Sequence, residues 1–305
     1  MKKFPKHITG LKNLDKEFFE IIFKKTKEFK NEITSRRNKF PDLSKYSVLN
    51  LFLEDSTRTR ISFELAEKHL GMKVVNFNAG LSSLSKGESL IDTVRNIDAM
   101  YFDFIVSRSS SAGFPELLIN NSNARIINGG DGIYEHPTQG LLDIFTITEK
   151  FKSLKGLNVC IIGDISHSRV AMSNIFGLTK LGAKVSVCGP KSFIPEGIEN
   201  LGVSIIDNTD NAIKQSDVVI LLRVQLERNA GYLLPSLKEY NKYYGLSLKR
   251  LELNPELLVL HPGPWNTGVE LDEEILNSHQ IRFYEQVTNG LAIKIALFTL
   301  MSGKI

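Results

Sequence analysis

The chain has 305 residues, of which 42% are hydrophobic and 24% charged, and its formal net charge is +4. This length allows two domains, and the composition is that of a globular protein. The positive charge is too small and too dispersed to indicate a nucleic-acid partner, although it suits a site for small anions. The sequence contains no run of about 18 apolar residues and no apolar leader, so we expect no membrane span and a cytoplasmic protein.

The two cysteines, Cys160 and Cys188, lie in the apolar, strand-like runs NVCIIGD and KVSVCGP. Neither belongs to a C-x-x-C pair. This pattern predicts two buried thiols in a reducing compartment, and it disfavours a disulfide or a zinc site.

Strand-like runs alternate with helical stretches through the first half of the chain. Residues 15–33 have helical apolar spacing, and Asp15 is the predicted N-cap of that helix. The remaining elements expected in this half are a strand at 46–53, a helix at 59–71, a strand at 73–78, a helix at 88–100, a strand at 102–109, a short helix at 115–121, a strand at 124–129 and a helix at 136–151.

The alternation starts again after the helix at 136–151. We expect strands at 158–164, 184–190, 203–207, 217–224 and 257–264, with helices at 167–182, 211–216, 272–278 and from 286 onward. Such alternation predicts an α/β fold with two doubly wound parallel-sheet domains and an active site in the cleft between them. The predicted domains are 1–149, on which a C-terminal helix at 286–305 packs back, and 150–285.

Polar and cationic residues follow six of the predicted strands. In chain order they are Ser56 to Arg60, Arg108, His136 with Gln139, Arg169, Arg223 with Gln225, and the segment 261–264. In sheets of this kind ligands bind outside the carboxyl ends of the strands. If both domains face one cleft, five arginines and a histidine would point into it.

These residue types favour two anionic ligands. Arginine holds planar anions through paired hydrogen bonds, and a helix that begins near Ser56 offers N–H groups to a phosphate. The strand ends carry no paired carboxylates for acid–base work and no cluster with metal-ligand spacing, so we expect no metal site. The turn GDISHS after the strand at 158 does not match the dinucleotide fingerprint, and no P-loop motif occurs.

Each residue also has a simpler structural interpretation. Arg108 suits a surface position, His136 suits a helix cap, and Lys86 suits a solvated loop at 80–87. The carboxylates of Glu54, Asp55 and Glu64 are expected to orient the nearby arginines rather than to act as catalytic acids. These interpretations weaken together, since all of these residues except Lys86 fall at one edge of the predicted sheets.

The motifs resemble those of the aspartate/ornithine carbamoyltransferase family over essentially the whole chain. The matching segments are FLEDSTRTRISFE, SLSKGESLIDTVR, FIVSR, HPTQGLLDIFTI, GDISHSRVAMSN, LLRVQLER, HPGP and QVTNGLA. The ornithine branch has a His-Cys-Leu-Pro segment where this chain has HPGP at 261–264, which favours aspartate as the acceptor. The resemblance implies carbamoyl transfer to the amine of L-aspartate in pyrimidine biosynthesis, without a cofactor.

The resemblance also implies a role for each residue that would bind carbamoyl phosphate. The phosphate would be held by Ser56, Thr57, Arg58 and Thr59. Arg108 would bridge the phosphate and the carbonyl oxygen, which Thr59 and His136 would polarise. Gln139 would orient the carbamoyl amide, and Pro262 and Gly263 would add backbone carbonyls near that amide.

Further residues would bind aspartate or come from a second subunit. Arg169, Arg223 and Gln225 would grip the two aspartate carboxylates, while Ser82 and the catalytic Lys86 would reach in from the neighbouring subunit of a homotrimer. The family closes its domains over the substrates, so a mobile loop at 225–247 is expected. The resemblance is compatible with a trimer that works alone, with a regulatory chain or with dihydroorotase.

Three positions depart from the family pattern, namely Met172, Thr267 and Lys294. Arginine is the common residue at each of them. Two alternatives to the aspartate reaction stay open at this point: transfer to another amine acceptor, and a catalytically silent protein of the same fold that binds a ligand or a partner.

Overall fold

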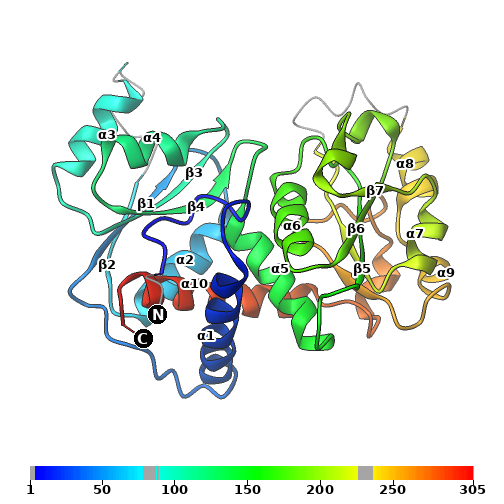
Figure 1. Ribbon diagram of the computed structural model, residues 1–305, viewed down its shortest axis with the longest axis horizontal. Coiled ribbons are helices and arrows are strands. Elements are labelled where there is room, and N and C mark those ends of the chain that lie inside the picture. The colour runs from blue at the N-terminus through cyan, green and yellow to red at the C-terminus, as the bar shows by residue number, and fades with distance from the viewer. Residues whose placement is uncertain (1–3, 78–86, 88, 226–235, 305) are drawn as a thin grey trace. The chain divides into compact units, whose positions relative to one another are not determined.

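The computed structural model describes residues 4–77, 87, 89–225 and 236–304, which form two compact units. The first unit contains residues 1–138 and 288–305, and the second contains residues 139–287. Each unit is built on a parallel sheet with helices on both faces (Figure 1). Both sheets therefore have the predicted α/β class.

The sheet of the first unit has the strand order β2-β1-β3-β4 within the described residues. Its strands are β1 (Ser47–Phe52), β2 (Lys73–Asn76), β3 (Phe104–Ser109) and β4 (Arg125–Asp131). Its helices are α1 (Lys16–Thr34), α2 (Thr57–His69), α3 (Leu90–Asp98) and α4 (Phe114–Asn121). Asp15 caps α1 as predicted, accepting a hydrogen bond from the N–H of Phe18.

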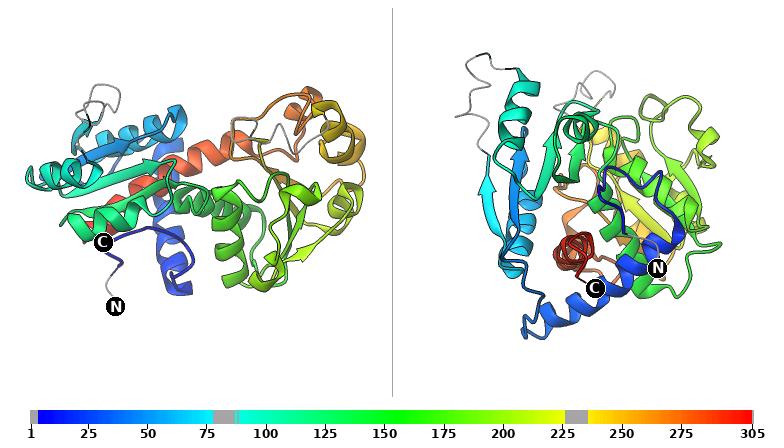
Figure 2. Two further views of the ribbon diagram at one scale, coloured as in Figure 1. Left: turned by 90° about the horizontal axis from the view of Figure 1, so that it is seen from above. Right: turned by 60° about the vertical axis from the view of Figure 1, so that its left-hand side comes forward.

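Two apolar layers enclose this first sheet. On one face, β-strand residues such as Leu49 and Ile105 pack against α3 and α4. On the other face, Phe298 of α10 (Phe283–Met301) contacts Phe104 of β3 and Phe63 of α2 through edge-on ring contacts. The ribbons of α2 and α10 lie side by side (Figures 1 and 2). The C-terminal part of α10 thus completes the core of the first unit.

The sheet of the second unit has the order β7-β6-β5-β8-β9 within the described residues. Its strands are β5 (Asn158–Ile162), β6 (Lys184–Cys188), β7 (Ser204–Ile205), β8 (Val218–Leu221) and β9 (Leu258–Leu260). Its longer helices are α5 (Pro137–Lys150), α6 (Arg169–Lys180) and α7 (Thr209–Gln215), followed by α8 (Leu237–Tyr244) and α9 (Leu248–Leu251). Short 3₁₀ helices occur at Lys191–Phe193, Ile198–Leu201 and Glu273–Asn277.

The core of the second unit contains both cysteines. Cys160 and Cys188 are free and buried, as predicted, on a face that packs against α7 and α9, whereas α5 and α6 lie on the opposite side of the sheet (Figure 1). Burial raises the pKa of the Cys160 thiol to about 12. These thiols are packing groups rather than reactive ones.

The predicted loop at 225–247 is wrong over residues 237–244, which form α8. Ser236 caps this helix by accepting a hydrogen bond from the N–H of Glu239, and Tyr240 is only 3% exposed. Tyr240 packs against Phe193 and Tyr244, so an aromatic face with helical spacing anchors the segment. No helix in the described part of the chain is long and apolar enough to span a bilayer.

Lys294 lies inside the first unit with its ammonium in an apolar environment. The side chain is 4% exposed, its Nζ donates to the carbonyl of Gly290 at 3.1 Å, and it lies 5.1 Å from the centre of the Phe63 ring. Burial lowers the pKa of Lys294 to about 7. The family departure at this position is thus a core substitution.

Replacing Lys294 with Met should change how stability depends on pH. In the parent, the unfolded lysine (pKa about 10.4) binds a proton between pH 7 and 10 that the folded lysine does not bind. The free energy of unfolding should therefore rise by about 1.4 kcal/mol per pH unit in this range through Lys294 alone. Lys294→Met removes this term, so the variant should be more stable than the parent at pH 7, with an advantage that shrinks toward pH 10.

Urea unfolding at pH 7, 8 and 9 measures this difference. Lys24→Met, at an exposed position of α1, is the matched control. Its free energy of unfolding should change with pH in the same way as that of the parent. A constant difference between the parent and Lys294→Met across these pH values would contradict the assignment.

Candidate active site

The strand order of each sheet reverses at one point, and most of the predicted site residues follow the strands beside that point. In the first unit the reversal lies between β1 and β3, and in the second it lies between β5 and β8. The carboxyl ends of these strands lead to Ser56, Arg108, Arg169 and Arg223. This position is where doubly wound sheets bind their ligands.

Helix α2 begins directly after β1, with Ser56 as its N-cap. Within the described residues, the Ser56 hydroxyl makes no capping hydrogen bond to the helix. Thr57 and Arg58 are exposed on the first turn, and the N–H groups of a first turn have no partner inside the helix. The terminus therefore offers N–H and hydroxyl groups to an anion, as the sequence predicted.

Arg108, near the end of β3, joins groups that follow β1 to groups on β4 and in the loop after it. Its Nε lies 2.7 Å from a Glu54 carboxylate oxygen, and its Nη1 donates to the Gly129 carbonyl at 2.9 Å. The same Nη1 lies 3.5 Å from Thr59 Oγ1 and 3.3 Å from His136 Nε2. Arg108 is thus a fixed, partly buried cation rather than a surface residue.

His136 is 6% exposed and makes contacts through both ring nitrogens. Because an arginine can only donate, the contact with Arg108 makes Nε2 the acceptor and puts the ring proton on Nδ1. Nδ1 lies 3.3 Å from Thr138 Oγ1, which can accept that proton. His136 and Thr59 thus contact the same nitrogen of Arg108, while the role of His136 toward a carbonyl oxygen stays a prediction.

A buried carboxylate, missed by sequence reasoning, holds the loop of His136. Glu135 is 1% exposed and accepts hydrogen bonds from the N–H groups of Leu11 at 2.7 Å and Lys12 at 3.3 Å. A Cβ at Gly10 would lie only 2.2 Å from the Glu135 carboxylate. A side chain at position 10 would therefore force the Glu135 carboxylate out of its present position.

The expectation for the acidic residues near α2 is confirmed for one and wrong for another. Glu54 pairs with Arg108 as expected. Glu64 instead pairs with Lys68 at 2.6 Å, one turn along the helix, and accepts from Asn76 at 3.2 Å, so its hydrogen-bond partners among the described residues are a lysine and an amide rather than an arginine. The Lys68 contact has i, i+4 spacing, which favours a local helical pair.

In the second unit, Arg169 and Arg223 follow β5 and β8. Arg169 is the first residue of α6 and is 6% exposed, and Ser168 caps that helix by accepting from the N–H of Ala171. The segment after β8 is held at the N–H of Val224, which donates to Glu270 at 2.7 Å. Gln225 Nε2 donates to the His167 carbonyl at 2.9 Å.

The segment 261–264 forms a tight turn after β9. The N–H of Gly263 donates to His261 Nδ1 at 2.8 Å, and Gly263 has a positive φ of 59° that favours glycine. The N–H of His261 donates to Gln286 Oε1 at 2.9 Å. The two hydrogen bonds fix the backbone around Pro262 and Gly263.

Gln139, on the first turn of α5, is oriented by a buried aspartate one turn along the helix. Its Nε2 donates at 2.8 Å to Asp143 Oδ1, and Asp143 is fully buried. Asp143 also accepts from the amides of Gln286 at 2.7 Å and Asn174 at 2.8 Å. Sequence reasoning missed Asp143, although the i, i+4 spacing from Gln139 placed it on the same helix face.

Two predicted residues, Ser82 and Lys86, lie outside the described residues. Of the departures from the family pattern, Thr267 is exposed on a turn and Met172 is half-buried on α6. Within the described ranges, no group of three or more His, Cys, Asp and Glu side chains is placed to hold a metal ion.

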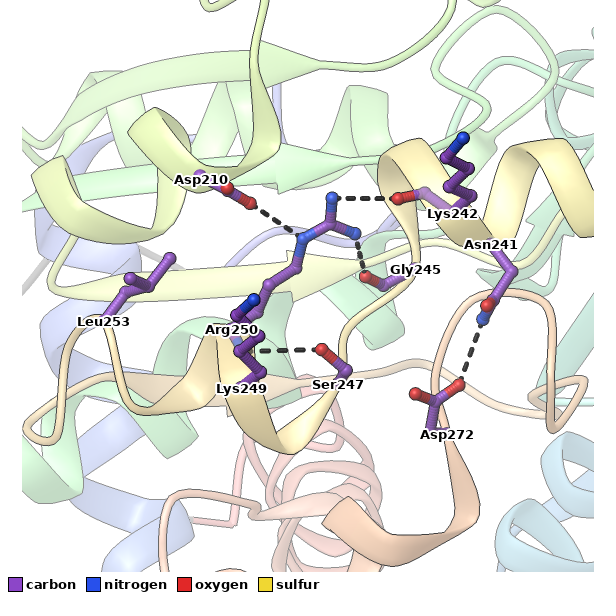
Figure 3. A pocket seen from close by; sticks show the side chains of 9 residues that line it. All are labelled: Asp210, Asn241, Lys242, Gly245, Ser247, Lys249, Arg250, Leu253 and Asp272. Carbon is purple, nitrogen blue, oxygen red and sulfur yellow. Dashed lines mark hydrogen bonds and ion pairs between the residues drawn. The ribbon is translucent and has the colours of Figure 1, made fainter.

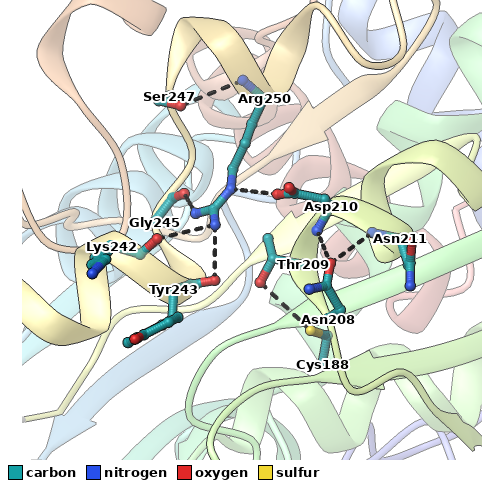
Figure 4. A network of polar contacts seen from close by, with 10 residues as sticks. All are labelled: Cys188, Asn208, Thr209, Asp210, Asn211, Lys242, Tyr243, Gly245, Ser247 and Arg250. Carbon is teal, nitrogen blue, oxygen red and sulfur yellow. Dashed lines mark hydrogen bonds and ion pairs between the residues drawn. The ribbon is translucent and has the colours of Figure 1, made fainter.

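The second unit also has a polar pocket, and the predicted site residues named above are not among those that line it. Its walls come from α7, α8, α9 and the loops around them, and include Asp210, Asn241, Arg250 and Asp272 (Figure 3). Arg250 pairs with Asp210 at 2.8 Å and donates to carbonyls at the end of α8, namely those of Lys242, Tyr243 and Gly245 (Figure 4). This arginine therefore caps the C-terminus of α8 and ties it to α7 and α9.

Comparison with known proteins identifies the family. Residues 6–149 match the sequence model of the aspartate/ornithine carbamoyltransferase, carbamoyl-P binding domain, and residues 155–301 match that of the Asp/Orn binding domain. The chain belongs to the aspartate/ornithine carbamoyltransferase family. Family membership explains why arginines follow strands in both sheets, because these arginines lie in the segments that resemble the family's motifs.

Relatives on the aspartate side of the family are similar along nearly their whole length. The aspartate carbamoyltransferase catalytic subunit of Acetivibrio thermocellus is 50% identical over 300 residues, which cover 98% of this chain and 96% of the relative. The Trypanosoma cruzi aspartate transcarbamoylase in complex with N-(phosphonacetyl)-L-aspartic acid has a TM-score of 0.87 and 28% identity, covering 97% and 95% of the two chains. The M. jannaschii catalytic subunit has a TM-score of 0.83 and 30% identity, covering 98% and 99%.

Gly10→Ala should destabilise the chain by about 2 kcal/mol, because the new methyl group displaces the buried Glu135 carboxylate from the N–H of Leu11. The double variant Gly10→Ala/Glu135→Asp shortens the carboxylate side chain by one carbon and should recover part of the loss. Urea unfolding of the parent and both variants measures this. A single variant as stable as the parent would contradict the close fit.

Proposed function

We propose that this chain transfers the carbamoyl group of carbamoyl phosphate to the amine of L-aspartate, giving N-carbamoyl-L-aspartate and phosphate for pyrimidine biosynthesis. The observation that carries the proposal is the convergence of Thr59, Arg108 and His136 at the reversal point of the first sheet. Relatives up to 50% identical are aspartate carbamoyltransferase catalytic subunits, which supports the same reaction.

The first unit binds carbamoyl phosphate in this proposal. The phosphate sits at the start of α2, where Ser56, Thr57, Arg58 and Thr59 present hydroxyl, guanidinium and N–H groups. Arg108 lies between this terminus and His136, so its guanidinium can reach both the phosphate and the carbonyl oxygen. Binding the substrate requires the guanidinium to exchange some of its present partners for phosphate oxygens.

The second unit binds aspartate and holds the carbamoyl amide. Arg169 and Arg223 pair with the two aspartate carboxylates, and Gln225 adds an amide donor or acceptor beside them. Gln139 and the backbone carbonyls of Pro262 and Gly263 orient the carbamoyl nitrogen. The HPGP segment at 261–264 supports aspartate rather than ornithine as the acceptor.

The chemistry then needs no bond to the protein. The neutral amine of aspartate attacks the carbamoyl carbon, and the carbonyl oxygen becomes an oxyanion. Thr59 and Arg108 donate to that oxyanion. His136 joins them once Arg108 has turned to the substrate and the ring proton is on Nε2, with the Thr138 hydroxyl donating to Nδ1. Stabilisation by such fixed donors is usually the largest contribution to catalysis of this kind. Collapse of the tetrahedral intermediate breaks the bond from carbon to the phosphate oxygen, and the proton lost by the amine leaves with phosphate.

We also propose that the active enzyme is a cytoplasmic homotrimer. Ser82 and Lys86 complete each site from the neighbouring subunit in this arrangement, so a single subunit is inactive. The family matches over residues 6–149 and 155–301 support this assembly, as do Lys86 in the SLSKGE motif and Ser82 directly before that motif.

The reaction is tested by phosphate release from carbamoyl phosphate with L-aspartate, L-ornithine or no acceptor, on protein whose mass is known from light scattering. We expect release only with aspartate, from a particle of three chains. Arg223→Ala should raise the KM for aspartate by about 100-fold, because the loss of a charged hydrogen-bond partner costs up to about 3 kcal/mol. The KM for carbamoyl phosphate should stay within threefold of the parent.

The other outcomes identify the alternatives. Turnover with ornithine or another amine alone would show a different acceptor specificity, set around Arg223 and Thr267. Binding of carbamoyl phosphate without turnover for any acceptor would show a silent binding protein, and the departures at Met172, Thr267 and Lys294 would then be the first positions to revert to arginine.

A further inference from the structure

Asp143 is a buried carboxylate whose hydrogen-bond partners among the described residues are neutral amides. It has no exposed surface, and it accepts hydrogen bonds from Gln139, Gln286 and Asn174 at 2.7 to 2.8 Å. Burial raises the pKa of Asp143 to about 6, and the three amide donors oppose that rise. At pH 7 to 8 the group is therefore an ionised acceptor that bonds to three different elements of the second unit.

The two carboxylate oxygens bond to different partners. Oδ1 accepts from both Gln139 and Gln286, while Oδ2 accepts from Asn174 on α6. An ionised carboxylate has no proton to donate, so it can bond only to the NH₂ end of each amide. Asp143 thus decides which end of Gln139 and of Gln286 faces it.

For Gln139, this choice turns the amide oxygen away from Asp143. The outward group of Gln139 is then an acceptor, and a carbamoyl NH₂ group needs acceptors for its two N–H bonds. If the amide were reversed, two NH₂ groups would face one another and the hydrogen bond would be lost. The substrate therefore depends on the direction in which the Gln139 amide points as much as on where the side chain lies.

For Gln286, the same choice continues into the turn after β9. Its Oε1 accepts from the N–H of His261 at 2.9 Å, and His261 Nδ1 accepts from the N–H of Gly263 at 2.8 Å. These hydrogen bonds connect Asp143 through Gln286 and His261 to the backbone of the 261–264 turn. The carbonyls of Pro262 and Gly263 in this turn are proposed to bind the same carbamoyl nitrogen as Gln139. Both arms of the network therefore end at groups that accept from the substrate.

We propose that Asp143 is a positioning residue that sets the direction of these hydrogen bonds, so that Gln139 and the 261–264 turn together present acceptors to the carbamoyl NH₂ group. This inference rests on the proposed function, since it concerns how the same site recognises carbamoyl phosphate. It assigns the recognition of the amide nitrogen to a carboxylate that does not touch the substrate.

Asp143→Asn tests the proposal because it keeps the shape and replaces one acceptor oxygen by a donor. We expect kcat/KM for carbamoyl phosphate to fall about 100-fold, the cost of a misplaced binding group. The KM for carbamoyl phosphate should rise, while the KM for aspartate stays within threefold. A purely structural loss would lower the amount of folded protein, and so the apparent kcat, without changing either KM.

The matched control is Asn254→Ala, which removes a partly buried amide of the second unit. Asn254 donates to the carbonyls of Ile213 and Ser216 at 3.1 and 2.8 Å and has no link to the Asp143 network among the described contacts. This variant should lose stability and keep both KM values. The double variant Gln139→Ala/Asp143→Asn should lose no more than about threefold beyond the worse single variant, because both changes disturb one interaction.

The outcomes separate the inference from the proposed function. An active parent with an Asp143→Asn variant within threefold of it, or with fully additive losses in the double variant, would overturn the inference alone. A parent without aspartate-dependent turnover would overturn the proposed function and the inference with it. If Asp143→Asn does not fold, Gln286→Met carries the test through the other arm: a raised KM for carbamoyl phosphate supports the inference, and an unchanged KM overturns it.

Discussion

A parallel sheet whose strand order reverses leaves one place at its carboxyl edge that no crossover connection covers, and both sheets of this chain place arginines there. Arg108 follows this rule in the first unit, and Arg169 and Arg223 follow it in the second. Guanidinium groups held at such a place are fixed donors for anions. The rest of the chemistry depends on this constraint, because transfer between two anionic substrates is mainly a matter of position and of charge stabilisation.

Buried carboxylates hold the groups that face this edge. Glu135 accepts from the backbone of Leu11 beside the His136 loop, and Glu270 accepts from the N–H of Val224 between Arg223 and Gln225. Asp143 does the same for side-chain amides. The partner in each of these contacts is a neutral N–H group, so these carboxylates act as fixed acceptors that hold the loop geometry. Burial raises the pKa of Glu270, while its hydrogen bonds oppose the rise.

The sequence predicted what depends on local pattern and missed what depends on distant contacts. Alternation and spacing along the sequence predict the strand ends, the start of α2 and the burial of the two cysteines. Glu135 contacts residues more than 120 positions away, which no local pattern reveals. Helix α8 was mistaken for a loop, although the spacing of Tyr240 and Tyr244 carried a helical signal. Ser82, Lys86 and the predicted domain roles remain predictions from the family resemblance.

We propose that the strand ends of the first unit bind carbamoyl phosphate and that those of the second unit bind aspartate. A crystal structure of the chain with N-(phosphonacetyl)-L-aspartate tests it most directly, because this compound joins a phosphonate to an aspartate. We expect the phosphonate at the start of α2 with Arg108 bound to it, and the two carboxylates on Arg169 and Arg223. A phosphonate bound elsewhere, or carboxylates that contact neither arginine, would contradict the claim.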